Sequence, residues 1–203
     1  MSKKPLIVFE GIEGRGKSHH INKLATYLTK EKKSFIQIRE PGGNKNSEKI
    51  RKLILDNKST FNKNTDLLLY LSARSENIDL IKKNYGKKII LSDRFVDSTL
   101  AYQHYGMGVN IEFIKTINKF LLKGITIDFT FLNLVTPKNM KKRLLIRKTL
   151  NRYDQFSASF YKKVQDGFIK IQKNKPTKYM KIDSNLNIND NQNIILKKIN
   201  ELI

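Results

Sequence analysis

The stretch PLIVFEGIEGRGKS, at residues 5–18, constrains the fold of this chain more than any other feature of the sequence. It begins with a short apolar run of β-forming residues. Gly11, Gly16, Lys17 and Ser18 then fill every fixed position of the pattern G-x-x-x-x-G-K-[ST]. Apolar residues follow at helical spacing, namely Ile21, Leu24, Ala25 and Leu28. Strand, glycine-rich loop and helix in this order predict a phosphate-binding loop.

The chemistry of such a loop follows from its geometry. Its backbone N–H groups converge on an anion at a helix N-terminus, and its glycines let the backbone approach phosphates closely. Lys17 is expected to reach the β- and γ-phosphates of ATP, and the Ser18 hydroxyl is expected to hold Mg²⁺. The alternative is a glycine turn before an ordinary helix. The complete pattern favours an ATP site built from Gly11, Ile12, Glu13, Gly14, Arg15, Gly16, Lys17 and Ser18.

Length and composition limit the class of protein. The chain has 203 residues, 39% of them hydrophobic, which suits a single α/β domain over residues 1–203 with a sizeable core. No apolar run of about 18 residues predicts a membrane span, and the apolar run near the start is too short for a signal peptide. The chain has no cysteine, which excludes disulfides and thiolate metal sites. These features predict a cytoplasmic protein without a membrane partner.

The charge of the chain is strongly positive. Its 40 Lys and Arg residues against 18 Asp and Glu give a formal net charge of +22. Such a charge favours polyanionic partners, such as nucleotide phosphates, nucleic acid or an acidic surface. A general contribution to solubility explains the same number equally well.

Apolar runs alternate with helical patterns along the chain, without internal repeats or linkers. This alternation predicts a three-layer P-loop NTPase fold, in which helices flank a central parallel sheet of about five strands and a short lid lies near residues 143–156. Strands are expected at residues 6–9, 34–39, 88–92, 127–133 and 179–182. Helices are expected at 17–31, 47–56, 65–83, 111–122, 137–147, 158–172 and 190–202. Ligands of such sheets bind at the carboxyl ends of the strands.

The second predicted strand leads into the shaped turn REPGG, at residues 39–43, and then into a basic helix that carries Arg51. On the next helix, Tyr70 and Arg74 lie four residues apart and therefore share a face. An aromatic ring beside a guanidinium can stack on a planar base and bind its edge. Each residue also has an alternative that involves no ligand. Tyr70 would pack in the core, and Arg51 and Arg74 would be ordinary surface charges.

The third predicted strand ends in Asp93, in the manner of a Walker B strand, and an aspartate there can support Mg²⁺ opposite Ser18. Arg94 follows it and points to the same crevice. The segment FVDSTLAYQ then places donors, acceptors and one ring on a turn or two of helix, at Ser98, Thr99, Tyr102 and Gln103.

A basic segment occupies the predicted lid. Arg143 and Arg147 are four residues apart on the expected 137–147 helix, and Arg152 follows in a polar stretch. A basic loop opposite a phosphate site can close over ATP and stabilise charge in the transition state. The alternative is a solvated basic helix followed by a linker. The histidines His19, His20 and His104 have no acidic cluster at metal-binding spacing, so they predict no metal site.

Together, and in this order, these motifs resemble the thymidylate kinase family, most closely its bacterial form. The resemblance extends over residues 7–172. It depends on EGIEGRGKS, REPGG, the YLSAR helix, SDRFVDSTLAYQ and the NRYD stretch in the lid. The resemblance implies transfer of a phosphoryl group from ATP to dTMP, with Mg²⁺, by an enzyme that forms a homodimer.

The resemblance also implies roles for individual residues. Glu13 would contact the sugar 3′-OH and the phosphate–metal network of the acceptor site. Arg51 and Arg94 would clamp the 5′-phosphate of dTMP. Tyr70 would stack on thymine, and Arg74 would bind its O4 edge. Tyr102 would lie against the deoxyribose, and Asp93 would support Mg²⁺. Base recognition would also involve Ser98, Thr99 and Gln103. The catalytic group would comprise Lys17, Arg94, Arg147, Arg152 and Arg15.

Basic residues stand both in the loop, at Arg15, and in the lid, at Arg147 and Arg152, so the sequence leaves open which of them neutralises transition-state charge. Four positions depart from the family pattern: Arg15 replaces a usual Ala, Tyr70 a usual Phe, His19 a usual Thr and Asn151 a usual Asp. Other functions also remain open. Another small-molecule kinase, such as a deoxynucleoside kinase, would share the loop. A nucleic-acid-dependent ATPase would explain the charge, although the chain has no recognisable nucleic-acid-binding motif.

Overall fold

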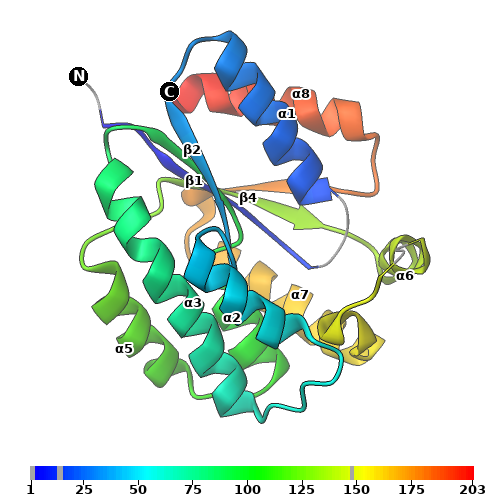
Figure 1. The fold of residues 1–203 in the computed structure, drawn as a ribbon. Coiled ribbons are helices and arrows are strands. Elements are labelled where there is room, and N and C mark those ends of the chain that lie inside the picture. The colour runs from blue at the N-terminus through cyan, green and yellow to red at the C-terminus, as the bar shows by residue number, and fades with distance from the viewer. Residues whose placement is uncertain (1–2, 13–15, 147–148) are drawn as a thin grey trace.

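The computed structural model describes residues 3–12, 16–146 and 149–203. Across these residues, five parallel strands form one sheet in the order β2-β3-β1-β4-β5 (Figure 1). The strands are β1 (Leu6–Glu10), β2 (Phe35–Arg39), β3 (Ile89–Asp93), β4 (Phe129–Leu134) and β5 (Tyr179–Asp183). The predicted α/β fold with a parallel sheet is confirmed, and each strand begins and ends within two residues of its predicted bounds.

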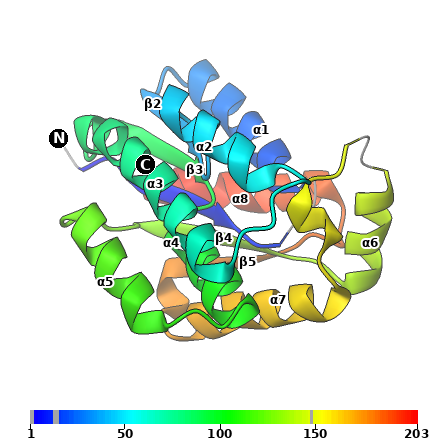
Figure 2. The same ribbon diagram turned by 60° about the horizontal axis from the view of Figure 1, so that its bottom comes forward.

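Helices cover both faces of the sheet, because alternate strand residues point to opposite sides. Ile7 and Phe9 pack with residues of α1 (Gly16–Lys30) and α8 (Ile188–Leu202). Leu6 and Val8 pack on the other side with residues of α3 (Lys63–Asn84), and α7 (Ala158–Lys173) covers Leu132 on β4 there. Figures 1 and 2 show α1 and α8 on one side of the sheet, with α3, α5 and α7 on the other. The predicted three-layer arrangement is confirmed.

The predicted helices are all present, and capping explains where two of them begin. The Asn44 side chain accepts from the backbone N–H groups of residues 46 and 47, so α2 (Lys45–Leu55) begins before the predicted residue 47. Asn62 caps α3 in the same way. The remaining long helices are α5 (Ile111–Leu122) and α6 (Pro137–Leu145), the latter ending two residues before the predicted 147. The described residues include no helix with the length and apolarity needed to span a membrane.

The segment after β3 is helical, as expected, but most of it is not α-helical. A short helix, α4 (Val96–Thr99), passes directly into a π-helix, η1 (Leu100–Gly106). The π-helix packs against α7 at Gly167, where a Cβ atom would lie 2.6 Å from the Tyr105 ring. Wide helical turns of this kind are frequent at functional sites. The sequence pattern does not distinguish a π-helix from an α-helix.

The predicted lid region contains two described elements. Helix α6 ends at Leu145, residues 147 and 148 lie outside the described residues, and a 3₁₀ turn, η2 (Arg152–Gln155), follows. Asn151 caps that turn, and the Asp154 carboxylate accepts in return from the backbone N–H of Asn151. The predicted lid therefore ends in a capped 3₁₀ turn before α7.

Candidate active site

The loop after β1 is shaped by its first glycine. Gly11 has φ of 131°, and a Cβ atom there would collide with the backbone oxygen of Asn133. Lys17, which is 5% exposed, turns back over the loop and donates from Nζ to the carbonyl oxygens of Gly11 and Ile12, at 3.0 and 2.8 Å. Its ammonium group therefore lies beside the first two residues of the loop. The predicted loop contacts of Glu13, Gly14 and Arg15 lie outside the described residues.

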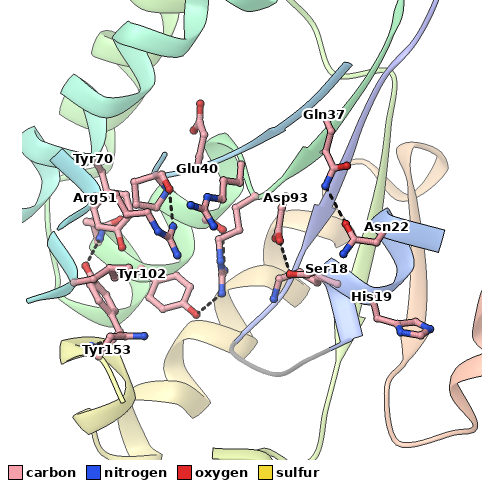
Figure 3. A pocket seen from close by; sticks show the side chains of 18 of the residues that line it. Ser18, His19, Asn22, Gln37, Glu40, Arg51, Tyr70, Asp93, Tyr102 and Tyr153 are labelled. Carbon is pink, nitrogen blue, oxygen red and sulfur yellow. Dashed lines mark hydrogen bonds between the residues drawn. The ribbon is translucent and has the colours of Figure 1, made fainter. Parts of the chain in front are cut away.

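Ser18 and Asp93 meet where the loop faces the end of β3. The Ser18 hydroxyl donates to Oδ2 of Asp93 at 2.8 Å (Figure 3). The sequence predicts that these two side chains face each other around a metal ion, and the structure brings them together. A hydroxyl and a carboxylate are the oxygen ligands that suit Mg²⁺.

Arg94 joins the phosphate loop to the helical segment that follows β3. It adopts φ of 69°, which is uncommon for a residue with a side chain. Its guanidinium donates to the Gly11 carbonyl at 2.7 Å, to the Ser98 hydroxyl at 3.1 Å and to the Tyr102 hydroxyl at 3.3 Å. This arrangement holds a fixed positive charge between the loop and the aromatic side of the site.

These residues line a cavity of about 620 Å³ at the carboxyl edge of the sheet. Its described lining is strongly cationic, with Lys17, Arg39, Arg51, Arg94 and Arg143 against Glu40 and Asp93. Figure 3 shows Ser18, His19 and Asn22 toward one end of the cavity and Tyr70, Tyr102 and Tyr153 toward the other. Arg51 donates to the Pro41 carbonyl at 2.6 Å, which places it against the turn after β2. The arrangement places several cations between a polar end and an aromatic end, which suits phosphate groups in the middle of the cavity.

The end away from the loop is aromatic. The rings of Tyr70 and Tyr102 both meet Tyr153 edge-on, with centroids 5.9 and 5.7 Å apart. Gln103 also lines the cavity and is 1% exposed; its Nε2 donates to Asp66, while its Oε1 is buried without a partner among the described residues. A buried acceptor without a partner is costly. A ligand with a matching N–H donor would therefore gain affinity here.

The structure does not bring Arg74 and Thr99 into the described lining of the cavity. Arg74 is 1% exposed and donates to Glu40, Asn118 and the Thr99 hydroxyl at 2.8, 2.6 and 2.9 Å. Burial raises the pKa of Glu40, and the Arg74 guanidinium opposes that shift. The direct contact from Arg74 to a base edge stays a prediction, and it requires rearrangement of this buried pair.

Of the two predicted lid arginines, Arg147 and Arg152, the structure describes only Arg152. Arg147 lies outside the described residues. Arg152 is held away from the phosphate loop: it forms an ion pair with Asp66, donates to the Ile54 carbonyl at 3.0 Å and stacks on Phe61. Its predicted role over ATP stays a prediction, and it requires the guanidinium to leave Asp66.

A buried acid cluster supports the segment that carries Arg94. Glu10, at the end of β1, accepts from the backbone N–H groups of Phe95 and Ser98 and from the Ser98 hydroxyl, at 2.8, 3.2 and 2.5 Å. Burial, together with nearby Asp97, raises the pKa of Glu10 to about 8. Burial also raises the pKa of Asp97, whose carboxylate accepts from the Tyr179 hydroxyl at 2.5 Å.

This raised pKa predicts how stability depends on pH. Between pH 4.5 and about 8 the folded protein keeps the Glu10 proton while the unfolded chain loses it, so the Glu10 contribution to the free energy of unfolding decreases across that range. Glu10→Gln mimics the protonated form and removes this decrease. In urea unfolding, we expect the variant to match the wild type near pH 5 and to be more stable at pH 8.5. An equal difference between the two proteins at both pH values would contradict the assignment.

Several lining residues carry no clear signal in the sequence. The sequence pattern places Tyr153 only in a polar stretch and Arg39 only at the start of a shaped turn. In the structure both line the cavity, and Arg39 forms an ion pair with Glu48 at 2.9 Å. It gives Arg143 only as one of two arginines on a lid helix, and the structure shows its side chain donating to the Ser184 carbonyl. His19, directly after Ser18, stands out only as a departure from a pattern. Among these residues, Arg39 alone has a sequence signal: it lies at the carboxyl end of a predicted strand, where ligands of parallel sheets bind.

Within residues 3–12, 16–146 and 149–203, no group of three or more His, Asp or Glu side chains is placed to hold a metal ion. In nucleotide sites Mg²⁺ commonly has only one or two carboxylate ligands, together with phosphate oxygens and water.

Comparison with known proteins gives a consistent result. The family model described as thymidylate kinase matches residues 9–195. The thymidylate kinase of Thermoanaerobacter sp. (strain X514) is 38% identical over 183 residues, covering 89% of this chain and 90% of that protein. The thymidylate kinase of Acholeplasma laidlawii is 37% identical over 197 residues, covering 95% and 97%. The crystal structure of thymidylate kinase from Ehrlichia chaffeensis superposes with a TM-score of 0.78 at 30% identity, covering 98% of this chain and 99% of that one.

Proposed function

The chain belongs to the thymidylate kinase family and transfers a phosphoryl group from ATP to dTMP, and we propose that the cavity described above binds both nucleotides end to end. One observation carries this proposal: Arg94 lies between the phosphate loop at one end of the cavity and the tyrosines and Gln103 at the other. Phosphoryl transfer depends mainly on alignment and on charge neutralisation, and this cavity supplies both.

At the donor end, the loop from Gly11 to Ser18 would bind the ATP phosphates. Lys17 already points toward the loop carbonyls, so phosphate oxygens could replace them as its acceptors. Ser18 and Asp93 would hold Mg²⁺, which neutralises the charge that develops on the transferred group. The loop residues Glu13, Gly14 and Arg15 are included on the strength of the sequence motif.

At the acceptor phosphate, Arg51 and Arg94 would form a clamp, with Glu13 near the sugar 3′-OH. A guanidinium suits this task because it donates two parallel hydrogen bonds to a phosphate. Arg39 and Arg143 add positive charge to the same cavity. For the transition state, Lys17 and Arg94 are the proposed catalytic cations, and Arg15, Arg147 and Arg152 stay candidates from the sequence.

At the base end, Tyr70 would stack on thymine and Tyr102 would lie against the deoxyribose. Oε1 of Gln103 would accept from N3–H of the base, which supplies the partner that this buried oxygen lacks among the described residues. Ser98 lines the cavity, whereas Thr99 and Arg74 form its support and would act on the base edge only after the buried pair of Arg74 and Glu40 rearranges.

We also propose a homodimer in the cytoplasm. The exposed apolar side chains Leu68 on α3 and Phe113 and Phe120 on α5, which are 51%, 46% and 65% exposed, support an apolar contact surface. The chain has no cysteine, so its fold does not depend on disulfides or on an oxidising compartment.

Arg51→Ala tests the acceptor clamp. We expect KM for dTMP to rise about 10- to 100-fold, because a charge-assisted bond to phosphate is lost, while KM for ATP changes by less than about threefold. Steady-state kinetics with each substrate varied in turn would measure both values. The exposed Lys49 on the same helix provides a matched control, and Lys49→Ala should leave both constants unchanged.

The same variant separates dTMP from an acceptor without a phosphate. A deoxynucleoside kinase would use thymidine in preference to dTMP, and its acceptor KM would not respond to Arg51→Ala. That pair of results would reject the proposed clamp and favour the alternative kinase.

A further inference from the structure

Asp66 is a buried carboxylate with no role in the site as described so far. It lies near the start of α3 and is 1% exposed. Its Oδ2 accepts from Nε2 of Gln103 at 3.0 Å and from the Tyr153 hydroxyl at 2.5 Å. Its Oδ1 accepts from the Arg152 guanidinium. One side chain thus connects the turn that carries Arg152 to Gln103, which lines the cavity.

We propose that Asp66 is a positioning residue for base selectivity, which fixes the Gln103 amide so that Oε1 faces the cavity as an acceptor for the N3–H of thymine. The inference rests on the proposed binding of dTMP in this cavity. It extends that proposal by explaining why the amide presents its oxygen rather than its NH₂ group to the base.

The neighbours of Gln103 allow one orientation of its amide. The Asp66 carboxylate can only accept. The Tyr153 hydroxyl donates to Asp66, and it therefore meets Nε2 of Gln103 as an acceptor, at 3.2 Å. Burial raises the pKa of Tyr153 well above its ordinary value, and nearby Tyr70 and Asp66 add to the shift, so the phenol keeps its proton. A reversed amide would place its oxygen against two oxygen acceptors.

Arg152 fixes the carboxylate in turn. Its guanidinium has donors and no acceptor, so the atom of residue 66 that faces it must be an oxygen. In Asp66→Asn, the amide oxygen would therefore stay toward Arg152, and the NH₂ group would take the place of Oδ2. That NH₂ group would face Gln103, whose amide would reverse and present its own NH₂ group to the cavity.

The reversal distinguishes two kinds of pyrimidine. N3 of thymine carries a hydrogen, whereas N3 of cytosine carries a lone pair. The wild-type Oε1 suits thymine and opposes cytosine, and the reversed amide of the variant would oppose thymine. A site built around one hydrogen-bonding pattern discriminates strongly against the opposite one.

The experiment compares kcat/KM for dTMP and for dCMP in the wild type, Asp66→Asn and the control Asp166→Asn. Asp166 forms an exposed ion pair with Lys162 at 2.9 Å, so its variant makes the same chemical change on the surface. We expect the ratio of dTMP to dCMP to fall by at least about tenfold in Asp66→Asn, chiefly through KM for dTMP. KM for ATP should change by less than about threefold, and the control should keep the wild-type ratio.

The ratio does not depend on the folded fraction, because a loss of folded enzyme lowers both values equally. Should Asp66→Asn fail to fold, Tyr153→Phe provides a second test: it removes one acceptor of Gln103, and we expect the ratio to fall about threefold. The inference is overturned if folded Asp66→Asn keeps the wild-type ratio of dTMP to dCMP. If Asp66→Asn does not fold, an unchanged ratio in Tyr153→Phe overturns it. A wild type that does not prefer dTMP overturns the proposed binding mode instead.

Discussion

Lys17→Ala is expected to lower kcat for dTMP phosphorylation by about 10³-fold. The Lys17 ammonium lies at the mouth of the phosphate loop, where it donates to the carbonyl oxygens of Gly11 and Ile12. During transfer it would stabilise negative charge on the β- and γ-phosphates, and alanine cannot replace that charge. The effect should appear in kcat measured at saturating dTMP and ATP.

The fold of this variant should persist, because the Lys17 side chain contacts the loop rather than the apolar cores. Lys23→Ala, an exposed lysine on the same helix, is the matched control and should keep wild-type turnover. Circular dichroism and thermal unfolding would confirm that both variants are folded. Turnover within about threefold of wild type in a folded Lys17→Ala protein would contradict the assignment of the loop.

Arg94→Ala is expected to raise KM for dTMP by about 100-fold and to lower kcat as well. In the structure, its guanidinium contacts the loop, Ser98 and Tyr102 at once, so it connects the donor end to the acceptor end. Arg94→Lys keeps a positive charge without the planar fork, and we expect an intermediate KM. Initial rates at varied dTMP and saturating ATP would measure these constants.

ATP binding provides the control for Arg94. Because Arg94 also donates to the Gly11 carbonyl, a general disturbance of the loop would weaken ATP binding too. Calorimetric titration of ATP should give a Kd within about threefold of wild type if Arg94 serves the acceptor. Weakened ATP binding with an unchanged KM for dTMP would place Arg94 at the donor site instead.

Much of the fold can be predicted because its signals are local. The loop pattern at Gly11 to Ser18 fixes a strand before it and a helix after it, and apolar periodicity gives the remaining elements. The carboxyl ends of parallel strands share one edge, so the sequence alone places Asp93 and Arg94 beside the loop. The structure confirms this placement through the contacts of Ser18 with Asp93 and of Arg94 with Gly11.

The rest depends on contacts that sequence spacing does not reveal. Asp66 and Arg152 are 86 residues apart, and no local pattern indicates that a lid arginine pairs with a helix aspartate. Arg74 shares a helix face with Tyr70, as predicted, yet its guanidinium is buried against Glu40. Helical spacing predicts which face of the helix a side chain lies on. Tertiary packing determines which group its terminal atoms contact. The π-helix at Leu100–Gly106, which packs against α7, is likewise not indicated by any local sequence pattern.

We propose that one cavity aligns ATP with dTMP and selects its acceptor by a phosphate clamp and a pyrimidine pocket. A coupled assay of ADP release tests it most directly, with dTMP, UMP, AMP and thymidine as acceptors under identical conditions. We expect the highest kcat/KM for dTMP, with thymidine poor for lack of a phosphate and AMP poor for lack of a pyrimidine ring. A higher kcat/KM for AMP, UMP or thymidine than for dTMP would contradict it.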